Sequence, residues 1–157
     1  MRAGVSIREN STMQNRSVPV NTVLPHLAYR DVGEAIDWLT RTFGLTEHYR
    51  HGEPAGPISG AQMRLGDAVI MLKRASGDFS SPANVGARTQ SLTIFVDDVD
   101  EHYARTQSAG ATITEELHET CYGERQYGAA DVDGHRWLFS QHVRDLSPDE
   151  WGAIIAR

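Results

Sequence analysis

The sequence has little cysteine, no long apolar run and fewer basic than acidic residues. Cys121 is the only cysteine among 157 residues, which excludes an internal disulfide and favours a reducing, cytoplasmic compartment. No apolar run approaches the ~20 residues that cross a bilayer, so we expect no membrane partner. The formal net charge of −6 argues against nucleic-acid partners, because such binding depends on the neutralisation of phosphates.

The first twenty residues are polar and lack the apolar segment of a secretory signal. We interpret residues 1–20 as a flexible tail. The whole chain has 39% hydrophobic and 23% charged residues, a balance typical of soluble globular proteins. The folded part is therefore expected to begin near residue 21.

From residue 21 onward the chain shows one order of predicted elements twice: strand, helix, three strands. Residues 32–43 have apolar side chains at helical spacing, preceded by Asp31 as the N-cap. Residues 98–109 repeat the pattern, with Asp98 at the equivalent place 67 positions later. A long and constant offset between matching features indicates a duplicated unit.

Each predicted repeat ends in a β-hairpin. Gly66-Asp67 lies at the turn of the hairpin 61–73, and Asp133-Gly134 lies at a tight turn within 125–141, since Gly accepts the positive φ of such turns. The expected class is α+β, with one face of each sheet covered by a helix and the other left for a partner or ligand. The expected division is module 1 at 21–74, a linker at 75–90, module 2 at 91–142 and a C-terminal helix at 147–157.

These motifs resemble the vicinal oxygen chelate superfamily, which contains glyoxalases, bleomycin-resistance proteins and extradiol dioxygenases. The matching residues are Tyr29-Arg30-Asp31 in the first repeat, and Phe95 to Val99 and Asp131 to Gly134 in the second. The resemblance covers residues 22–141. It implies two tandem βαβββ modules that form a curved mixed sheet around a cleft, and a homodimer as the common assembly.

The resemblance also indicates where metal-dependent members hold their ion. The corresponding positions in this chain are Leu24, Met71, Ser91 and Leu138. None of them is an imidazole or a carboxylate, the ligands that Zn²⁺, Mn²⁺ or Fe²⁺ requires. We therefore expect no metal and no other cofactor, as in the bleomycin-resistance branch.

Strand alternation gives the candidate ligand-binding residues of the implied cleft. His26 is either a ligand-contacting or proton-transferring residue, or an ordinary half-buried histidine. Tyr122 and Arg125 are expected at the cleft mouth, where Arg125 pairs either with an anionic ligand or with a surface carboxylate. The remaining candidates are Met71, Ser91, Thr93, Phe95, Arg136 and Leu138.

Three functional hypotheses follow. The first is a metal-independent binding protein for a small molecule, such as a cationic antibiotic or an aromatic metabolite. The second is a glyoxalase-like lyase or isomerase that uses His26 or Tyr122 as its proton carrier. The third is a dioxygenase-related enzyme with a metal at non-standard positions, where His26 would be joined by His118, Glu124 or His135. No nucleophile–base pair is visible, so the sequence favours binding without turnover.

Overall fold

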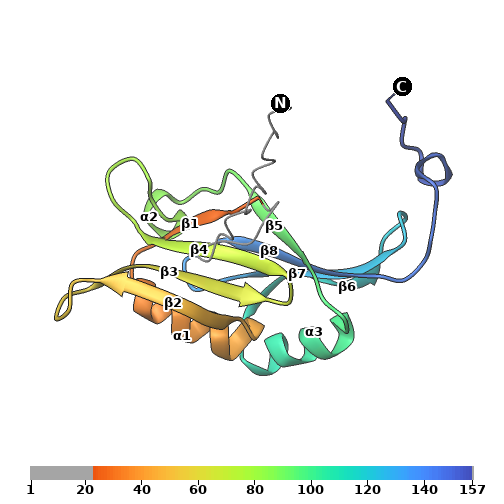
Figure 1. Cartoon of the computed structure of the whole chain (residues 1–157). Coiled ribbons are helices and arrows are strands. Elements are labelled where there is room, and N and C mark those ends of the chain that lie inside the picture. Colours follow the sequence, from red (N-terminus) through yellow and green to blue (C-terminus); the bar gives the residue numbers. More distant parts are fainter. Residues whose placement is uncertain (1–22, 157) are drawn as a thin grey trace, which may run out of the picture.

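The computed structural model describes residues 23–156, so the tail predicted at 1–20 lies outside the described residues. Two four-stranded sheets carry the fold (Figure 1), with strand orders β1-β4-β3-β2 and β5-β8-β7-β6. The elements are β1 (His26–Tyr29), α1 (Val32–Phe43), β2 (Thr46–Gly52), β3 (Ile58–Leu65), β4 (Ala68–Arg74), α2 (Pro82–Val85), β5 (Ser91–Phe95), α3 (Val99–Ser108), β6 (Thr112–Glu119), β7 (Glu124–Ala130), β8 (Arg136–His142) and the 3-10 turn η1 (Pro148–Trp151).

The two sheets have the same topology and the same register. In each, the first strand pairs in parallel with the last, and the other neighbours are antiparallel. His26 lies opposite Met71 in the first sheet, and Thr93 lies opposite Leu138 in the second. The predicted α+β class with two mixed sheets is confirmed. The module boundaries at 21–74 and 91–142 stay a prediction.

The helices begin where the sequence predicts, and local capping explains why. The side chains of Asp31 and Asp98 accept hydrogen bonds from the backbone N–H groups of Glu34 and Glu101, each at 3.0 Å. Gly44 ends α1 in the left-handed conformation at φ 75°, which costs a glycine little. No helix within residues 23–156 is long and apolar enough to cross a membrane.

One core serves both sheets. Figure 1 shows α1 and α3 on the same side of the two sheets. Phe43, from α1, packs its ring 5.4 Å from Trp137 and 4.8 Å from Phe139 of β8, and all three side chains are fully buried. The helix of the first repeat therefore packs against the sheet of the second.

The end of β1 is joined to the β7–β8 turn by hydrogen bonds to two buried aspartates. Asp131 accepts from the hydroxyl of Tyr29 at 2.6 Å and from the indole N–H of Trp137 at 2.9 Å. Asp133 accepts from the backbone N–H and the guanidinium of Arg30 at 2.7–3.1 Å. We call this contact the first junction between the repeats.

The expectation about the C-terminal end is corrected. The C-terminal helix expected at 147–157 is only the 3-10 turn η1, which ends at Gly152 with φ 90°. Its capping box, formed by Ser147 and Glu150, orders one turn, but η1 has no buried residue and so no packing to extend it. Within residues 23–156 the first strand, β1, begins at His26.

The tight Asp133-Gly134 turn is also corrected. The connection between β7 and β8 runs from 131 to 135, because Ala130 pairs with Arg136. Asp131 accepts the backbone N–H groups of Asp133 and His135 at 3.0 and 2.9 Å, which stabilises the wider turn. The linker predicted at 75–90 contains the short helix α2.

His102 of α3 is half-buried and packs against the shared core. Its Nε2 donates to the carbonyl of Phe43 at 2.8 Å, and its Nδ1 accepts from the hydroxyl of Tyr127 at 2.6 Å. Because a carbonyl only accepts, Nε2 carries a proton, and in the neutral ring Nδ1 accepts from the hydroxyl of Tyr127. Burial lowers the pKa of His102 from its ordinary value of 6.5.

We therefore expect the stability of the protein to fall in mild acid. The unfolded chain binds a proton at His102 before the folded chain does, so this contribution is complete above pH 6.5 and is lost as the pH falls below it. Urea unfolding measured between neutral and mildly acidic pH should show a steeper loss for the wild type than for His102→Gln. Equal slopes would contradict a neutral, half-buried His102.

Candidate functional site

The candidate site is the face of each sheet that α1 and α3 do not cover, which we call the open face. The register shows which residues share it. One row crosses the first sheet through His26, Met71, Gln62 and Tyr49. The equivalent row of the second sheet contains Thr93, Leu138, Gly128 and Glu115.

The open face of the first sheet is organised around a buried glutamine. The side-chain amide of Gln62 donates to the hydroxyl of Tyr49 at 3.3 Å and to the sulfur of Met71 at 3.6 Å, and its oxygen contacts His48 Nδ1. Met71 is only 8% exposed. These contacts restrict the side chains of Met71 and Tyr49, which form an ordered part of the open face.

The open face of the second sheet carries a polar network with a carboxylate. Gln126 donates to Glu115 at 2.9 Å and accepts from the hydroxyls of Tyr122 and Ser140, each at 3.1 Å. Beside Ser140 on the neighbouring strand, the ring of Phe95 is 60% exposed. An exposed aromatic ring close to a fixed network of donors and acceptors is typical of a small-molecule site.

His26 borders a cavity of about 320 Å³ between β1 and the 75–90 connector, a size that accepts a small ligand. Two other basic residues of its lining are already engaged. His135 Nε2 donates to the carbonyl of Ala28 at 2.7 Å, and Arg88 Nε donates to the carbonyl of Gly134. His26 is exposed at the strand edge and remains the candidate for ligand contact.

The structure separates Arg125 from the other candidates. Arg125 and Tyr127 are two residues apart on β7, so their side chains lie on the same face. The buried ring of Tyr127 is on the helix side, and Arg125 is therefore on that side too. Its guanidinium binds Asp100 of α3 at 2.9 and 3.0 Å, and this bond lowers the pKa of Asp100. Of the two partners expected for Arg125, an anionic ligand or a surface carboxylate, the structure thus supports the surface carboxylate.

The other candidates lie together on the open face. Ser91, Thr93 and Phe95 of β5 are exposed and pair with Arg136, Leu138 and Ser140 of β8. Tyr122 lies at the rim, where its ring is 5.8 Å from that of Trp151. Sequence reasoning missed Gln62, Gln126 and Glu115, although strand alternation places Gln126 on the face opposite Tyr127.

The residues that face one another at the implied metal positions do not fit a divalent metal. The register pairs Met71 with His26 and Leu138 with Thr93, so these four residues, rather than Leu24 and Ser91, share the equivalent rows. They offer one imidazole, one hydroxyl, one thioether and one alkyl group, too few hard or borderline donors for Zn²⁺, Mn²⁺ or Fe²⁺. In the described part of the chain, no group of three or more His, Cys, Asp or Glu side chains is placed to hold a metal.

Two equivalent mixed sheets, each with one face left open by the helices, define the class of fold. Residues 20–139 match the model of the Glyoxalase/Bleomycin resistance protein/Dioxygenase superfamily. The chain belongs to this superfamily, which confirms the resemblance inferred from its motifs.

Similar proteins of known sequence or structure agree with this assignment. The uncharacterized protein Rv0887c of Mycobacterium tuberculosis is 31% identical over 137 residues, which are 84% of this chain and 81% of that protein. TioX from Micromonospora sp. ML1 is 33% identical, with a TM-score of 0.64 over 80% of this chain and 99% of TioX.

Two further structures share the fold at lower identity. The bleomycin resistance determinant encoded on transposon Tn5 is 19% identical, with a TM-score of 0.63 over 78% of this chain and 98% of that one. TnmS3, an antibiotic binding protein from Streptomyces sp. CB03234, is 23% identical, with a TM-score of 0.59 over 76% of this chain and 93% of TnmS3.

Proposed function

We propose that this protein binds and sequesters a small cationic or aromatic molecule, such as an antibiotic, without a metal and without turnover. The observation that carries the proposal is the open face of the second sheet, where Phe95 is exposed beside the Glu115–Gln126 network. An aromatic ring and a carboxylate recognise a flat cation through stacking and charge. The names of TnmS3 and the Tn5 determinant support a ligand of the antibiotic class.

The proposed assembly is a homodimer in the cytoplasm. Each open face lacks a helix on its outer side, and a second copy turned by a two-fold axis would bring the first sheet of one copy over the second sheet of the other. Such a cleft would combine Tyr49 and Met71 from one copy with Phe95 and Leu138 from its partner. Cys121 is exposed and unpaired, as suits a reducing compartment.

A thermal-shift titration with metal-free bleomycin as the probe tests the proposal. A ligand at about 100 times its Kd stabilises the folded state by about 2.7 kcal/mol, which corresponds to about 5–10 °C for a protein of this size. Phe95→Ala should weaken binding at least about fivefold, since stacking contributes about 1 kcal/mol beyond the buried area. Ile154→Ala, at a 97% exposed position, is the control and should bind normally.

An absent shift with bleomycin is followed by the same titration with other cationic antibiotics and aromatic amines. The proposal fails if none of them stabilises the wild type. It also fails if Phe95→Ala binds as tightly as Ile154→Ala.

The exposed His26 at the edge of its cavity favours a second candidate function, a lyase or isomerase that uses acid–base chemistry. His26→Gln distinguishes the two candidates. Under the binding proposal this variant keeps its affinity for the probe within about threefold, because one neutral contact contributes about 0.5 kcal/mol. Turnover of a hemithioacetal by the wild type that disappears in His26→Gln would instead establish the enzyme.

A further inference from the structure

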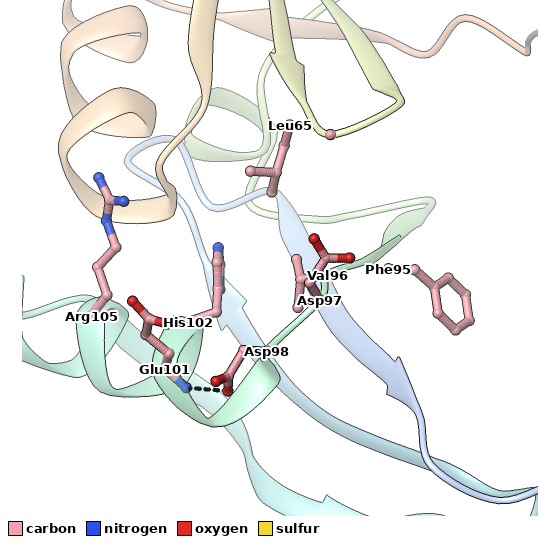
Figure 2. Close-up of a pocket in the computed structure, with 9 residues that line it drawn as sticks. Leu65, Phe95, Val96, Asp97, Asp98, Glu101, His102 and Arg105 are labelled. Carbon is pink, nitrogen blue, oxygen red and sulfur yellow. Dashed lines mark hydrogen bonds between the residues drawn. The ribbon is translucent and has the colours of Figure 1, made fainter.

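The duplication creates a second junction between the repeats, equivalent to the first. At the first junction, the end of β1 meets the β7–β8 turn through Tyr29 and Asp131. At the second, the end of β5 meets the β3–β4 turn, and a cavity of about 300 Å³ lies between them. Its lining residues are Leu65, Gly66, Phe95, Val96, Asp97, Asp98, Glu101, His102 and Arg105 (Figure 2).

The register identifies the equivalent residues at the two junctions. His26 and Met71 correspond to Thr93 and Leu138 at an offset of 67, so Tyr29 corresponds to Val96 and Arg30 to Asp97. Ala130 pairs with Arg136 of β8, and Arg64 pairs with Val69 of β4. Because Arg136 lies 67 positions after Val69, Ala130 corresponds to Arg64. The next residue, Asp131, therefore corresponds to Leu65.

The substitutions at these positions explain why the second junction is hollow. The hydrogen-bonded pair of Tyr29 and Asp131 is replaced by Val96 and Leu65, two apolar side chains that are shorter and cannot form that bond. Where the first junction holds the guanidinium of Arg30 against Asp133 at 3.1 Å, the second has the carboxylate of Asp97. The second junction therefore has a cavity and the carboxylate of Asp97 where the first has the guanidinium of Arg30.

The charge around the cavity is negative. Figure 2 shows Asp97 and Leu65 on one side and Glu101, His102 and Arg105 on the other. The guanidinium of Arg105 donates to the carbonyls of Thr40 and Arg41 at the end of α1, so it is already engaged with a helix C-terminus. Asp97 has no ion-pair or hydrogen-bond partner within residues 23–156.

We propose that this cavity is a second binding site, for a small organic cation with an ammonium or guanidinium group and an apolar body. Asp97 pairs with the cationic group, in the place that Arg30 and Asp133 fill at the first junction. Leu65 and Val96 contact the apolar body. A volume of about 300 Å³ lies at the small end of known ligand pockets, which suits an aromatic or alkyl amine and excludes a larger antibiotic.

The test is a titration of the ¹⁵N-labelled full-length protein with 2-phenylethylamine, observed in two-dimensional NMR spectra. Saturable shifts are expected at the amides of Leu65, Gly66 and Val96 to Glu101. The matched anion 3-phenylpropionate should give none. Asp97→Asn should weaken binding of the amine about fivefold, as expected for a partly exposed ion pair. Asp78→Asn, which removes an exposed carboxylate at the other cavity, should leave it unchanged.

A further variant tests the argument from the repeat. Asp97→Arg places a guanidinium in the cavity, as at the first junction, and should abolish binding of the amine while the spectrum stays that of a folded protein. The inference is overturned if the wild type shows no saturable shift at these amides, or if Asp97→Asn and Asp97→Arg bind like the wild type. Shifts confined to Met71 and Leu138 would overturn it as well, because they would place the amine on the open face of the proposed function.

Discussion

Asp131→Ala is expected to lower the free energy of unfolding by about 3–5 kcal/mol. The carboxylate is 7% exposed, while Tyr29 and Trp137, which donate to it, are fully buried. Alanine would leave the Tyr29 hydroxyl, the Trp137 indole N–H and two backbone N–H groups without their acceptor. An unsatisfied buried donor costs about 1–3 kcal/mol, and solvent entering the turn offsets only part of the sum.

Urea unfolding followed by tryptophan fluorescence measures this loss. Tyr29→Phe removes a single donor and should cost about 1–2 kcal/mol, less than the loss of the common acceptor. Asp78→Ala serves as the matched control, because this carboxylate lies in an exposed turn and its removal should change stability by under about 0.5 kcal/mol. A loss below about 1 kcal/mol for Asp131→Ala would mean that the first junction contributes little to folding.

The features that the sequence predicts correctly are those specified by neighbouring residues. Asp31 and Asp98 cap helices through a backbone N–H three residues later, and the apolar residues of α1 recur at helical spacing. The repeat is visible because both copies keep their helix caps at one offset. Strand alternation correctly places Thr93, Phe95 and Leu138 on one face, because the period of two needs no tertiary information.

The features that it misses depend on contacts between the repeats. Asp131 and Asp133 of the β7–β8 turn bind Tyr29 and Arg30, which lie 102 and 103 positions away. His102 is half-buried, and its Nε2 donates a hydrogen bond to the carbonyl of Phe43, 59 positions away. No local pattern encodes these partners. The polar network of the open face was missed for the same reason, since Gln126 and Glu115 become neighbours only across paired strands.

Phe43→Ala should be the most destabilising replacement of a single apolar side chain at the boundary between the repeats, with a loss of about 3–5 kcal/mol. The ring is fully buried and lies 4.8–5.4 Å from the rings of Trp38, Trp137 and Phe139. Its removal leaves a cavity where the first helix meets the second sheet. Because tightly packed rings relax only partly, the cost combines lost burial with lost contacts.

The additivity of the losses and the number of unfolding transitions show whether the two repeats fold together. Phe43→Leu keeps most of the volume and should cost about 1–2 kcal/mol, so the difference between the two variants isolates the ring. Phe43→Ala combined with Phe139→Ala should be less destabilising than the sum of the single losses, since both remove one contact. Additive losses, or a second unfolding transition in Phe43→Ala alone, would show that each repeat folds on its own core. A single transition with non-additive losses would show that the two repeats fold as one unit, which holds both open faces on the same side of the molecule.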